Sequence, residues 1–459
     1  MSMKQLAKLS TFTLAMLITG TVDSVRNLPV AALFGSTLIF FFIFSAIVFL
    51  IPAALVSADL SAKMPGQGGI YYWVRAAFGE KMGFLAIWLQ WISNVFWFPT
   101  MFSFVAGTAI YFISPELAQN KFYLVSAILV ILWSLTWVNL KGIDIAAKFT
   151  SICTIIGLII PMGLIIALGI LWVVLGNPLQ IHLTSTNIFP HLQHSENWIA
   201  LTGIMTAFCG MELATVHSRD VQNPEKAFPR ALLLSVTLIL STMILGSLSI
   251  AFVLPQEKIN LVNGVMQTAS YFFSAYHLGW MMPVITVMLV LGSLGGITSW
   301  LISPVKGLLH AAEEDYLPAF LRYQNSKGVP RNLLIVQAIF VSLVCLCFFM
   351  LPSVNASYWL LTALSTQLYM LMYVMMFIAA LYLRGTWITW IICILGLFGC
   401  AITLIVGFLP PTNMDIGSAF NYELLFVGGL VSMILPVGLA YLYKSKRESS
   451  PEAAAMDVS

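Results

Sequence analysis

Long apolar runs, each about the length of a membrane-crossing helix, fill most of this chain. A helix needs roughly 20 consecutive apolar residues to cross the hydrocarbon core of a bilayer. Only 8% of the residues are charged, whereas soluble domains carry about 25%, so a soluble protein of this size could not cover its surface with charge. We therefore predict an all-α polytopic membrane protein with twelve transmembrane helices, over 9–34, 36–58, 83–113, 122–140, 147–175, 197–217, 229–254, 279–305, 332–351, 357–383, 386–409 and 421–443.

Lysine and arginine fall almost entirely on one side of this predicted arrangement. With the N-terminus in the cytoplasm, all but three of the 21 Lys and Arg residues lie on the cytoplasmic side. Lys121 and Lys258 lie outside, and Arg26 lies within the membrane. Because the cytoplasmic loops of membrane proteins carry an excess of Lys and Arg, the distribution predicts that both termini are cytoplasmic.

The connecting loops are too short to hold a soluble domain. Residues 1–445 should form a single transmembrane domain, and 446–459 should form a short disordered cytoplasmic tail, because that tail is polar and has few large apolar residues. The six cysteines lie in apolar runs without metal-ligand spacing, so we expect no disulfide framework, no bound metal and no cofactor.

The stretch "ITGTVDSVRNLPV" places Asp23 and Arg26 inside the first apolar run. A charge at the bilayer centre costs at least about 2.5–3.5 kcal/mol. In one interpretation the two residues, three apart on a helix, pair with each other and only shape the helix. In the other, the helix is broken and its unwound backbone lines a water-filled cavity, because Gly, Thr, Ser, Asn and Pro weaken a continuous helix there.

A second interruption falls in the sixth run, where Gly210 and Glu212 lie in the middle of an apolar segment. Glu212 taken alone could be a buried acid paired with Arg26, or a cap on a half-helix. Runs one and six are each the first of five, and paired interruptions at corresponding positions of two halves indicate a transporter binding site. Five helices per half also require the second half to run inverted.

Several motifs resemble one known family. "PGQGGIYYWVRAAFGEKMGF" follows the second run, "FCGMELATVHSRDVQNPEKAFPRA" passes through the sixth, and "SWLISPVKGLLHAAEEDYLPAFLRYQNSKGVP" follows the eighth. These segments, with "INLVNGVMQT", resemble the amino acid–polyamine–organocation superfamily, close to its bacterial glutamate/GABA antiporter branch. The resemblance implies a LeuT-type fold with inverted repeats over about 9–175 and 197–383, followed by helices over 386–443. It also implies a place in the bacterial inner membrane.

The resemblance also assigns residues to a substrate site. It implies that backbone amides of the unwound part of helix 1 bind the substrate carboxylate, where a half-helix N-terminus favours an anion. Carbonyls of the unwound part of helix 6 would receive the substrate ammonium. Glu212 would serve proton coupling or gating. The substrate-binding residues that we predict are Val22, Asp23, Ser24, Arg26, Asn94, Phe208, Cys209, Gly210, Tyr369 and Tyr373.

Each of these assignments has a structural alternative. Tyr369 and Tyr373 could be packing residues on one helix face, Asn94 could hold two membrane helices together by a hydrogen bond, and Glu212 could be structural. The chain also departs from the branch at helix 8, where Gly295 and Gly296 replace an acid and mark a predicted selectivity region.

The sequence leaves the transported side chain open. Helix 1 of the branch's glutamate carriers has tyrosine, glutamate and tyrosine where this chain has Arg26, Asn27 and Leu28. Arg26 could attract an acidic side chain, whereas Asp23 could hold a cation on a basic one. Which of these two charges faces the cavity is therefore the open point.

We predict an amino acid antiporter that works by alternating access. It would exchange one amino acid for another or for its decarboxylation product. A proton-coupled symporter of the same fold is the alternative. No H-E-x-x-H, G-x-S-x-G or paired intramembrane aspartates are present, so we expect no enzyme. The expected partners are amino acids and membrane lipid, without nucleic acid, and the oligomeric state is left open.

Overall fold

The structure, a computed structural model, describes residues 10–64, 69–142, 155–190, 198–214, 224–383, 386–411 and 415–448. Every regular element in these ranges is a helix. The longer elements are α1 (Thr11–Val22), α3 (Leu38–Ser45), α4 (Ile51–Lys63), α5 (Ile70–Phe78), α6 (Glu80–Tyr111), α7 (Lys121–Leu140), α9 (Ile160–Val174), α12 (Ala200–Phe208), α14 (Pro224–Val253), α15 (Gly264–Ala275), α16 (Met282–Glu313), α17 (Arg331–Val344), α19 (Val354–Tyr382), α20 (Trp387–Val406) and α21 (Ala419–Glu448).

Short helical segments complete the described chain. They lie at breaks, bends and connections between the longer helices. They are η1 (Val25–Asn27), α2 (Leu28–Ala32), η2 (Gly35–Thr37), η3 (Ala46–Leu50), η4 (Pro115–Gln119), η5 (Ile155–Ile159), α10 (Ser185–Ile188), α13 (Met211–Ala214), η7 (Gln256–Lys258), η8 (Gly279–Met281), η9 (Ala319–Arg322) and α18 (Cys347–Met350).

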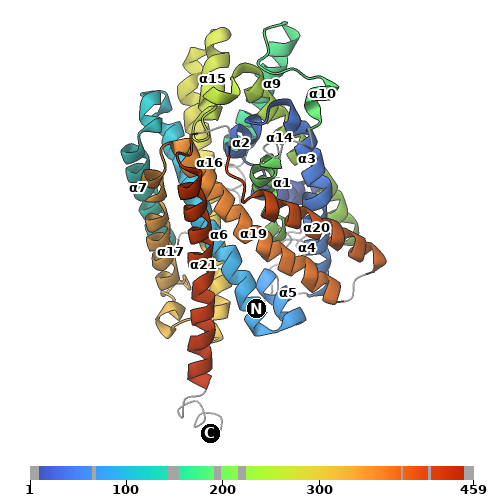
Figure 1. The fold of residues 1–459 in the computed structure, drawn as a ribbon, viewed down its shortest axis with the longest axis vertical. Helices are drawn as coiled ribbons and strands as arrows, with labels where there is room; N and C mark the ends of the chain where they lie inside the picture. Colours follow the sequence, from blue (N-terminus) through green and yellow to red (C-terminus); the bar gives the residue numbers. More distant parts are fainter. Residues whose placement is uncertain are drawn as a thin grey trace, which may run out of the picture.

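Most helices run along the long axis of a single bundle (Figure 1). In the described part of the chain, nine helices are long and apolar enough to cross a membrane. Three more of the predicted runs correspond to α6 and to the two broken helices, α1 with α2 and α12 with α13. The all-α membrane fold is as predicted, and the count of twelve crossings stays a prediction.

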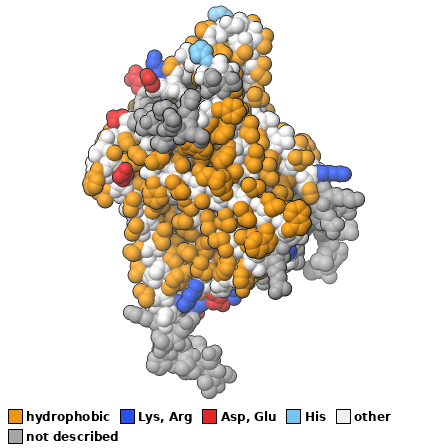
Figure 2. Space-filling model, turned by 45° about the vertical axis from the view of Figure 1, so that its right-hand side comes forward, with side chains coloured by type: hydrophobic (Ala, Val, Ile, Leu, Met, Phe, Trp, Pro, Cys, Tyr) orange, Lys and Arg blue, Asp and Glu red, His pale blue; other side chains and the backbone are white. Residues whose placement is uncertain are grey.

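The outer surface of the bundle fits a lipid environment. Figure 2 shows a face whose middle is covered by hydrophobic side chains, while charged side chains lie mainly toward the ends. The exposed large hydrophobic residues include many on α7, α20 and α21. Because soluble monomers rarely expose apolar patches of this extent, this surface is the one that lipid covers.

Helix 1 is broken where the sequence predicts it. α1 ends at Val22, Asp23 and Ser24 are not helical, and the chain resumes as η1 and α2. Ser24 has an extended backbone with φ −152° and ψ 127°, and Pro29 lies in the first turn of α2. Proline is favoured in a first turn because it lacks the N–H that would go unpaired there. The sequence therefore starts a new helix after the break.

Helix 6 is broken at Cys209 and Gly210. α12 ends at Phe208, and Cys209 has an extended backbone with φ −68° and ψ 148°. Gly210 has φ +106°, a conformation that glycine adopts without a steric penalty. α13 begins directly after it. This glycine makes the sharp turn between the two half-helices possible.

The two broken helices contact each other closely. Gly203 of α12 lies against Val30 of α2, and a Cβ added to Gly203 would lie 2.3 Å from Cγ1 of Val30. α6 and α19 pack against each other beside the breaks, and α6 also packs on α16. The breaks therefore lie inside the bundle, where protein and not lipid surrounds the unpaired backbone groups.

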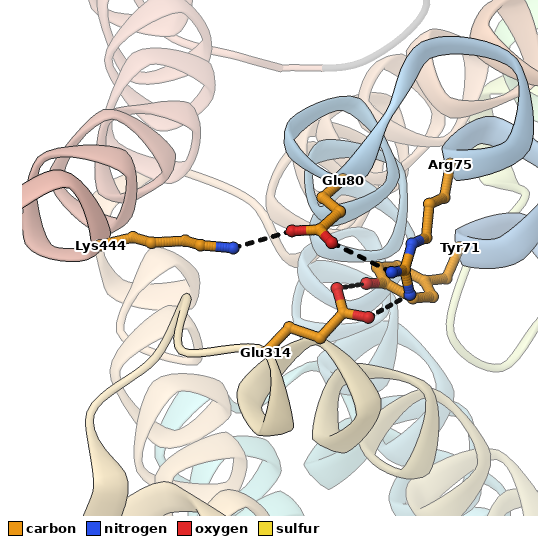
Figure 3. A network of polar contacts seen from close by, with 5 residues as sticks. All are labelled: Tyr71, Arg75, Glu80, Glu314 and Lys444. Carbon is orange, nitrogen blue, oxygen red and sulfur yellow. Dashed lines mark hydrogen bonds and ion pairs between the residues drawn. The ribbon is translucent and has the colours of Figure 1, made fainter. Parts of the chain in front are cut away.

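A polar network lies at the lower end of the bundle as drawn in Figure 1, near α5 (Figure 3). Arg75 binds Glu314, which also accepts a hydrogen bond from Tyr71. Glu80 accepts hydrogen bonds from Arg75 at 3.0 Å and from Lys444 of α21 at 2.9 Å. The network thus joins α5, the start of α6, the end of α16 and the last helix.

The last helix continues farther than the sequence predicts. α21 ends at Glu448, whereas the predicted helix ends at 443 and the predicted tail begins at 446. The contact of Lys444 with Glu80 holds this extra turn against α6. The remaining part of the predicted tail, 449–459, lies outside the described residues.

Candidate functional site

A cavity of about 110 Å³ lies at the helix 1 break, between α6, α12, α16 and α19. Four predicted site residues line it from helix 1, namely Val22, Asp23, Ser24 and Arg26. Four others line it from the surrounding helices, namely Asn94, Cys209, Tyr369 and Gly296. The structure therefore brings most of the predicted substrate residues together around one space.

The other predicted residues lie behind the cavity wall. Phe208 is fully buried, and its ring lies 5.8 Å from that of Phe42. The Gly210 N–H donates a hydrogen bond of 3.1 Å to the Tyr373 hydroxyl. Gly295 is buried in α16, one residue before the cavity-lining Gly296. These residues shape the wall and are not part of the lining.

Arg26 is held by neutral groups. Its Nη1 donates hydrogen bonds to Thr100 Oγ1 at 2.9 Å and to the Tyr358 hydroxyl at 3.0 Å. Its guanidinium carbon lies 5.2 Å from the centre of the Trp97 ring. Nε has no hydrogen-bond partner, although the side chain is 98% buried, its exposed fraction being 2%. Within the described ranges, no carboxylate forms an ion pair with this arginine.

Asp23 does not pair with Arg26, although the two lie three residues apart. Its Oδ2 instead accepts a hydrogen bond of 2.7 Å from Thr242 of α14. The interpretation of a local pair within a continuous helix is therefore wrong. The physical reason is the break itself, because an extended Ser24 turns the two side chains toward different helices.

Glu212 lies in a cage of hydrogen-bond donors. Oε1 accepts hydrogen bonds from Gln90 Nε2 at 2.9 Å and from the Tyr369 hydroxyl at 2.6 Å. Oε2 accepts from the Tyr373 hydroxyl. The alternative in which Glu212 pairs with Arg26 is wrong as well, since Arg26 makes its hydrogen bonds with other groups.

The side chains of Arg26 and Glu212 are hydrogen-bonded to the same two helices, α6 and α19, at different levels along them. On α19, Tyr358 binds Arg26 and Tyr369 binds Glu212, which places the two partners roughly 17 Å apart along a helix that rises about 1.5 Å per residue. On α6, Thr100 and Gln90 have the same two roles. Asn94 and Trp97 of α6 and Ser365 and Thr366 of α19 line the cavity between these levels, while Met101 and Phe104 line it beyond Thr100.

Sequence reasoning missed several polar and aromatic residues of the site. Gln90 binds Glu212, and Thr242 binds Asp23. Thr206 of α12 and Thr366 of α19 line the cavity and are hydrogen-bonded to each other. Trp97 lines it beside Arg26. Helical spacing could have found two of them, because Gln90 lies four residues before Asn94 and Thr366 lies three before Tyr369.

The groups that line the cavity are typical of a site that binds a small molecule. Among the described residues, no group of three or more His, Cys, Asp and Glu side chains is arranged to hold a metal ion. The lining combines an arginine, a carboxylate, hydroxyls and indole rings with the free backbone of a broken helix. Such a mixture can recognise a small zwitterion by its charges while apolar groups enclose the rest.

Comparison with known proteins decides the family. The sequence profile of the family described as amino acid permease matches residues 9–431. The chain belongs to this family. Amino acid permeases are membrane transporters and not enzymes, so the chain is a multi-pass membrane transporter.

Two relatives of this amino acid permease match it over nearly their whole length. A protein of Legionella pneumophila described as "Uncharacterized transporter lpg1691" is 38% identical over 96% of this chain and 97% of its own. A glutamate/gamma-aminobutyrate antiporter of Lactococcus lactis is 29% identical over 96% of this chain and 91% of its own. Both matches therefore extend over nearly all of this chain.

The fold also matches a solved transporter. A manganese transporter of Eremococcus coleocola superposes with a TM-score of 0.59 over 96% of this chain and 95% of its own, at 13% sequence identity. Identity that low shows the fold alone. It confirms the predicted LeuT-type architecture of this amino acid permease and carries no statement about its substrate.

Proposed function

We propose that this amino acid permease is an antiporter that exchanges an amino acid with an anionic side chain for its decarboxylation product or for another such amino acid. The transport would take place across a bacterial inner membrane, with both chain termini in the cytoplasm. The antiporter of Lactococcus lactis, similar over almost its whole length, supports exchange. The distribution of Lys and Arg supports the orientation.

The buried Arg26 side chain is the observation that carries the proposal. A buried charge without a counter-charge is costly, and leaving one partner of a buried pair alone costs about 3–5 kcal/mol. Here the guanidinium has two hydroxyls and an indole ring around it, and its Nε lacks a partner. A carboxylate that enters the cavity would supply the missing counter-charge. The structure therefore favours an anionic ligand group at this position.

Exchange with a decarboxylation product follows from the same contact. An acidic amino acid and the product of removing its α-carboxylate keep the same side-chain carboxylate. Arg26 can hold both through that shared group, so one site serves both directions of exchange. A substrate with a basic side chain would instead place a like charge beside Arg26, which is unfavourable in a region of low dielectric constant.

The remaining predicted contacts complete the substrate site in this proposal. Backbone amides around Val22 to Ser24 would bind the α-carboxylate when it is present. Carbonyls around Phe208 to Gly210 would receive the ammonium group. Asp23 and Ser24 lie outside regular helix, as do Cys209 and Gly210. The Asp23 N–H donates to the Thr19 carbonyl and the Gly210 N–H to the Tyr373 hydroxyl, so a ligand would exchange some of these bonds for its own.

Exchange assays in proteoliposomes test the proposal. Full-length protein is reconstituted with unlabelled glutamate inside, and labelled glutamate is added outside. We expect rapid uptake into loaded vesicles and little into empty ones. Uptake into empty vesicles that is driven by a proton gradient would instead establish the symporter. Internal lysine or arginine that supports exchange as well as glutamate does would refute the role of Arg26.

Two variants of Arg26 sharpen this assay. Arg26→Gln should lower glutamate exchange at least tenfold, the effect of losing about 1.4 kcal/mol. Arg26→Lys keeps the charge and should retain part of the activity, although lysine lacks the planar fork of arginine. The thermal unfolding temperature of each variant separates a binding defect from a folding defect. Unchanged glutamate exchange in Arg26→Gln would contradict the proposal.

A further inference from the structure

Two lysines lie together where α7 ends. Lys141 directly follows the last residue of α7, and the Lys327 Nζ donates a hydrogen bond to the Lys141 carbonyl. Asn325 fixes the same loop to α7, because its Nδ2 donates to the Leu140 carbonyl at 2.7 Å. The loop between η9 and α17 therefore holds the second lysine beside the first. Both lysines are exposed.

The charges of these two lysines exceed what the surrounding protein offsets. The C-terminal end of a helix such as α7 carries a partial negative charge of about one half, whereas the two ammonium groups carry two positive charges. Among the described residues, neither lysine forms an ion pair. Asp315, an acid at the end of α16, is paired with Arg322. The region therefore keeps a net positive charge and favours an anion.

The lysines border a surface that faces lipid. α7 and α17 pack side by side (Figure 1), and Trp133 of α7 donates a hydrogen bond of 3.2 Å to Ser342 of α17. Both helices expose large apolar side chains, since Trp137 of α7 is 59% exposed and Leu343 of α17 is 57% exposed. Lipid chains that cover this pair of helices lead along α7 to the lysines at its end.

One tryptophan connects the apolar surface to the charge. The Lys141 Nζ lies 3.4 Å from the centre of the Trp137 ring, as expected for the attraction between a cation and the face of an indole. Tryptophan is enriched where the hydrocarbon core of a bilayer meets the headgroups. The ammonium group is thus held at the level of the headgroups, where it can meet a lipid phosphate.

We propose that Lys141 and Lys327 bind the phosphate of an anionic phospholipid whose acyl chains lie along the exposed face of α7 and α17. The phosphate supplies the missing counter-charge and accepts charge-assisted hydrogen bonds from the two ammonium groups. The acyl chains cover the apolar side chains, which a free anion cannot do. The bound lipid thereby ties α7 to the loop that leads into α17.

This lipid site is separate from the substrate site. Neither lysine lines the cavity at the helix 1 break. The proposal therefore does not depend on which amino acids are exchanged. Only the placement of the lipid in the cytoplasmic leaflet, where anionic lipids attract basic residues, rests on the proposed orientation of the chain.

The test measures lipid binding in the absence of substrate. The purified full-length protein is melted in detergent with increasing phosphatidylglycerol. A parallel series uses phosphatidylcholine, whose choline group offsets the charge of its phosphate. A ligand that binds the folded state raises the unfolding temperature as its concentration rises. We expect a saturating rise of several degrees with phosphatidylglycerol and a smaller one with phosphatidylcholine. Equal responses to the two lipids would overturn the proposal.

Variants decide whether the response belongs to the two lysines. Lys141→Gln and Lys327→Gln should each raise the phosphatidylglycerol concentration at half-maximal response about fivefold, the effect of one basic residue near an anionic lipid surface. The double variant with arginine at both positions keeps the charges and should keep the midpoint within about twofold. The unfolding temperature of each variant without lipid provides its baseline. An unchanged midpoint in both glutamine variants would contradict the proposal.

A lysine at the opposite end of α7 is the matched control. The Lys121 Nζ also donates to a carbonyl, that of Leu351, at 2.5 Å. Lys121→Gln should leave the midpoint unchanged. An equal weakening in Lys121→Gln would show that the lipid responds to overall charge and not to this site. Inorganic phosphate that produces the full response at the same concentration would show that the ligand is a free anion. Either result would refute the lipid site and leave the exchange assay unaffected.

Discussion

The two helix breaks place charged side chains in opposite situations. At the helix 6 break, Glu212 accepts hydrogen bonds from Gln90, Tyr369 and Tyr373. At the helix 1 break, Asp23 and Arg26 each retain an unpaired buried atom. The helix 6 charge is stabilised by the protein itself. The helix 1 charges keep hydrogen-bonding capacity that the protein does not use, and in our proposal a ligand in the cavity uses it.

The difference also suggests that the helix 6 break is the more rigid of the two and that the helix 1 break is the one that binds a ligand. Hydrogen bonds to a charged group are worth about 1.5–3 kcal/mol each, so Glu212 ties α13 firmly to α6 and α19. Releasing α13 requires breaking that set of bonds. Arg26 and Asp23 hold their neighbours less completely and can form new bonds with a ligand. We expect mutations at the helix 6 break to change stability first and mutations at the helix 1 break to change selectivity first.

The largest effect should follow from Glu212→Gln. An amide group in this cage presents a donor to other donors, so at least one buried donor loses its acceptor, at a cost of about 1–3 kcal/mol or more. We expect a clearly lower unfolding temperature, together with loss of transport or a flattened pH profile. Thermal unfolding and exchange at several pH values measure both. A variant with wild-type stability and a wild-type pH profile would show that the cage is not structural and that Glu212 does not couple protons.

An effect of intermediate size is expected from removing the hydroxyls of Tyr369 and Tyr373, and the two variants should differ in stability. Tyr373 donates to Glu212 and accepts the Gly210 N–H, whereas the Tyr369 hydroxyl donates to Glu212 and, among the described residues, holds no backbone group of the break. Tyr373→Phe should therefore lower stability more than Tyr369→Phe does, by about 1 kcal/mol, the worth of one further hydrogen bond. Chemical or thermal unfolding of both variants under one condition measures the difference. Equal losses would mean that the Gly210 contact contributes nothing to the break.

The smallest effect should follow from Ser24→Ala. Ser24 lines the cavity with an extended backbone, and backbone groups are proposed to bind the ligand there. Removing the hydroxyl should change stability by less than about 0.5 kcal/mol and leave exchange nearly intact. Deleting 449–459 serves as a second mild change, since it keeps Lys444, and should leave transport unaltered. A large loss of exchange in Ser24→Ala would show that the side chain, not the backbone, reads the substrate.

The breaks themselves could be predicted from the sequence because their causes are local. Glycine at 210 permits a positive φ, and Pro29 suits the first turn of a new helix. Charges at membrane depth also indicate that the segment faces protein or a cavity. The all-α membrane fold could be predicted for the same reason. The length and apolar composition of each run indicate a transmembrane helix without any knowledge of the helices that it packs against.

The partners of the charged residues could not be predicted, because they come from distant parts of the chain. Thr100, Tyr358 and Thr242 lie far from residues 23–26 in sequence, and a hydroxyl in an apolar run carries no sign of which charge it will meet. The spacing of Asp23 and Arg26 suggested a pair because helical geometry was assumed. Once the helix is broken, that spacing no longer brings the side chains together.

The contact between Lys444 and Glu80 has a consequence for how the protein is made. Glu80 and Arg75 are synthesised early, whereas Lys444 lies near the end of the chain. Chains are translated from the N-terminus, and their segments start to assemble before translation is complete. The contacts of Arg75 and Tyr71 with Glu80 and Glu314 in Figure 3 can therefore form before α21 is made, and the contact between Glu80 and Lys444 can form only afterwards. This contact therefore attaches the last described helix to a part of the bundle that is already assembled.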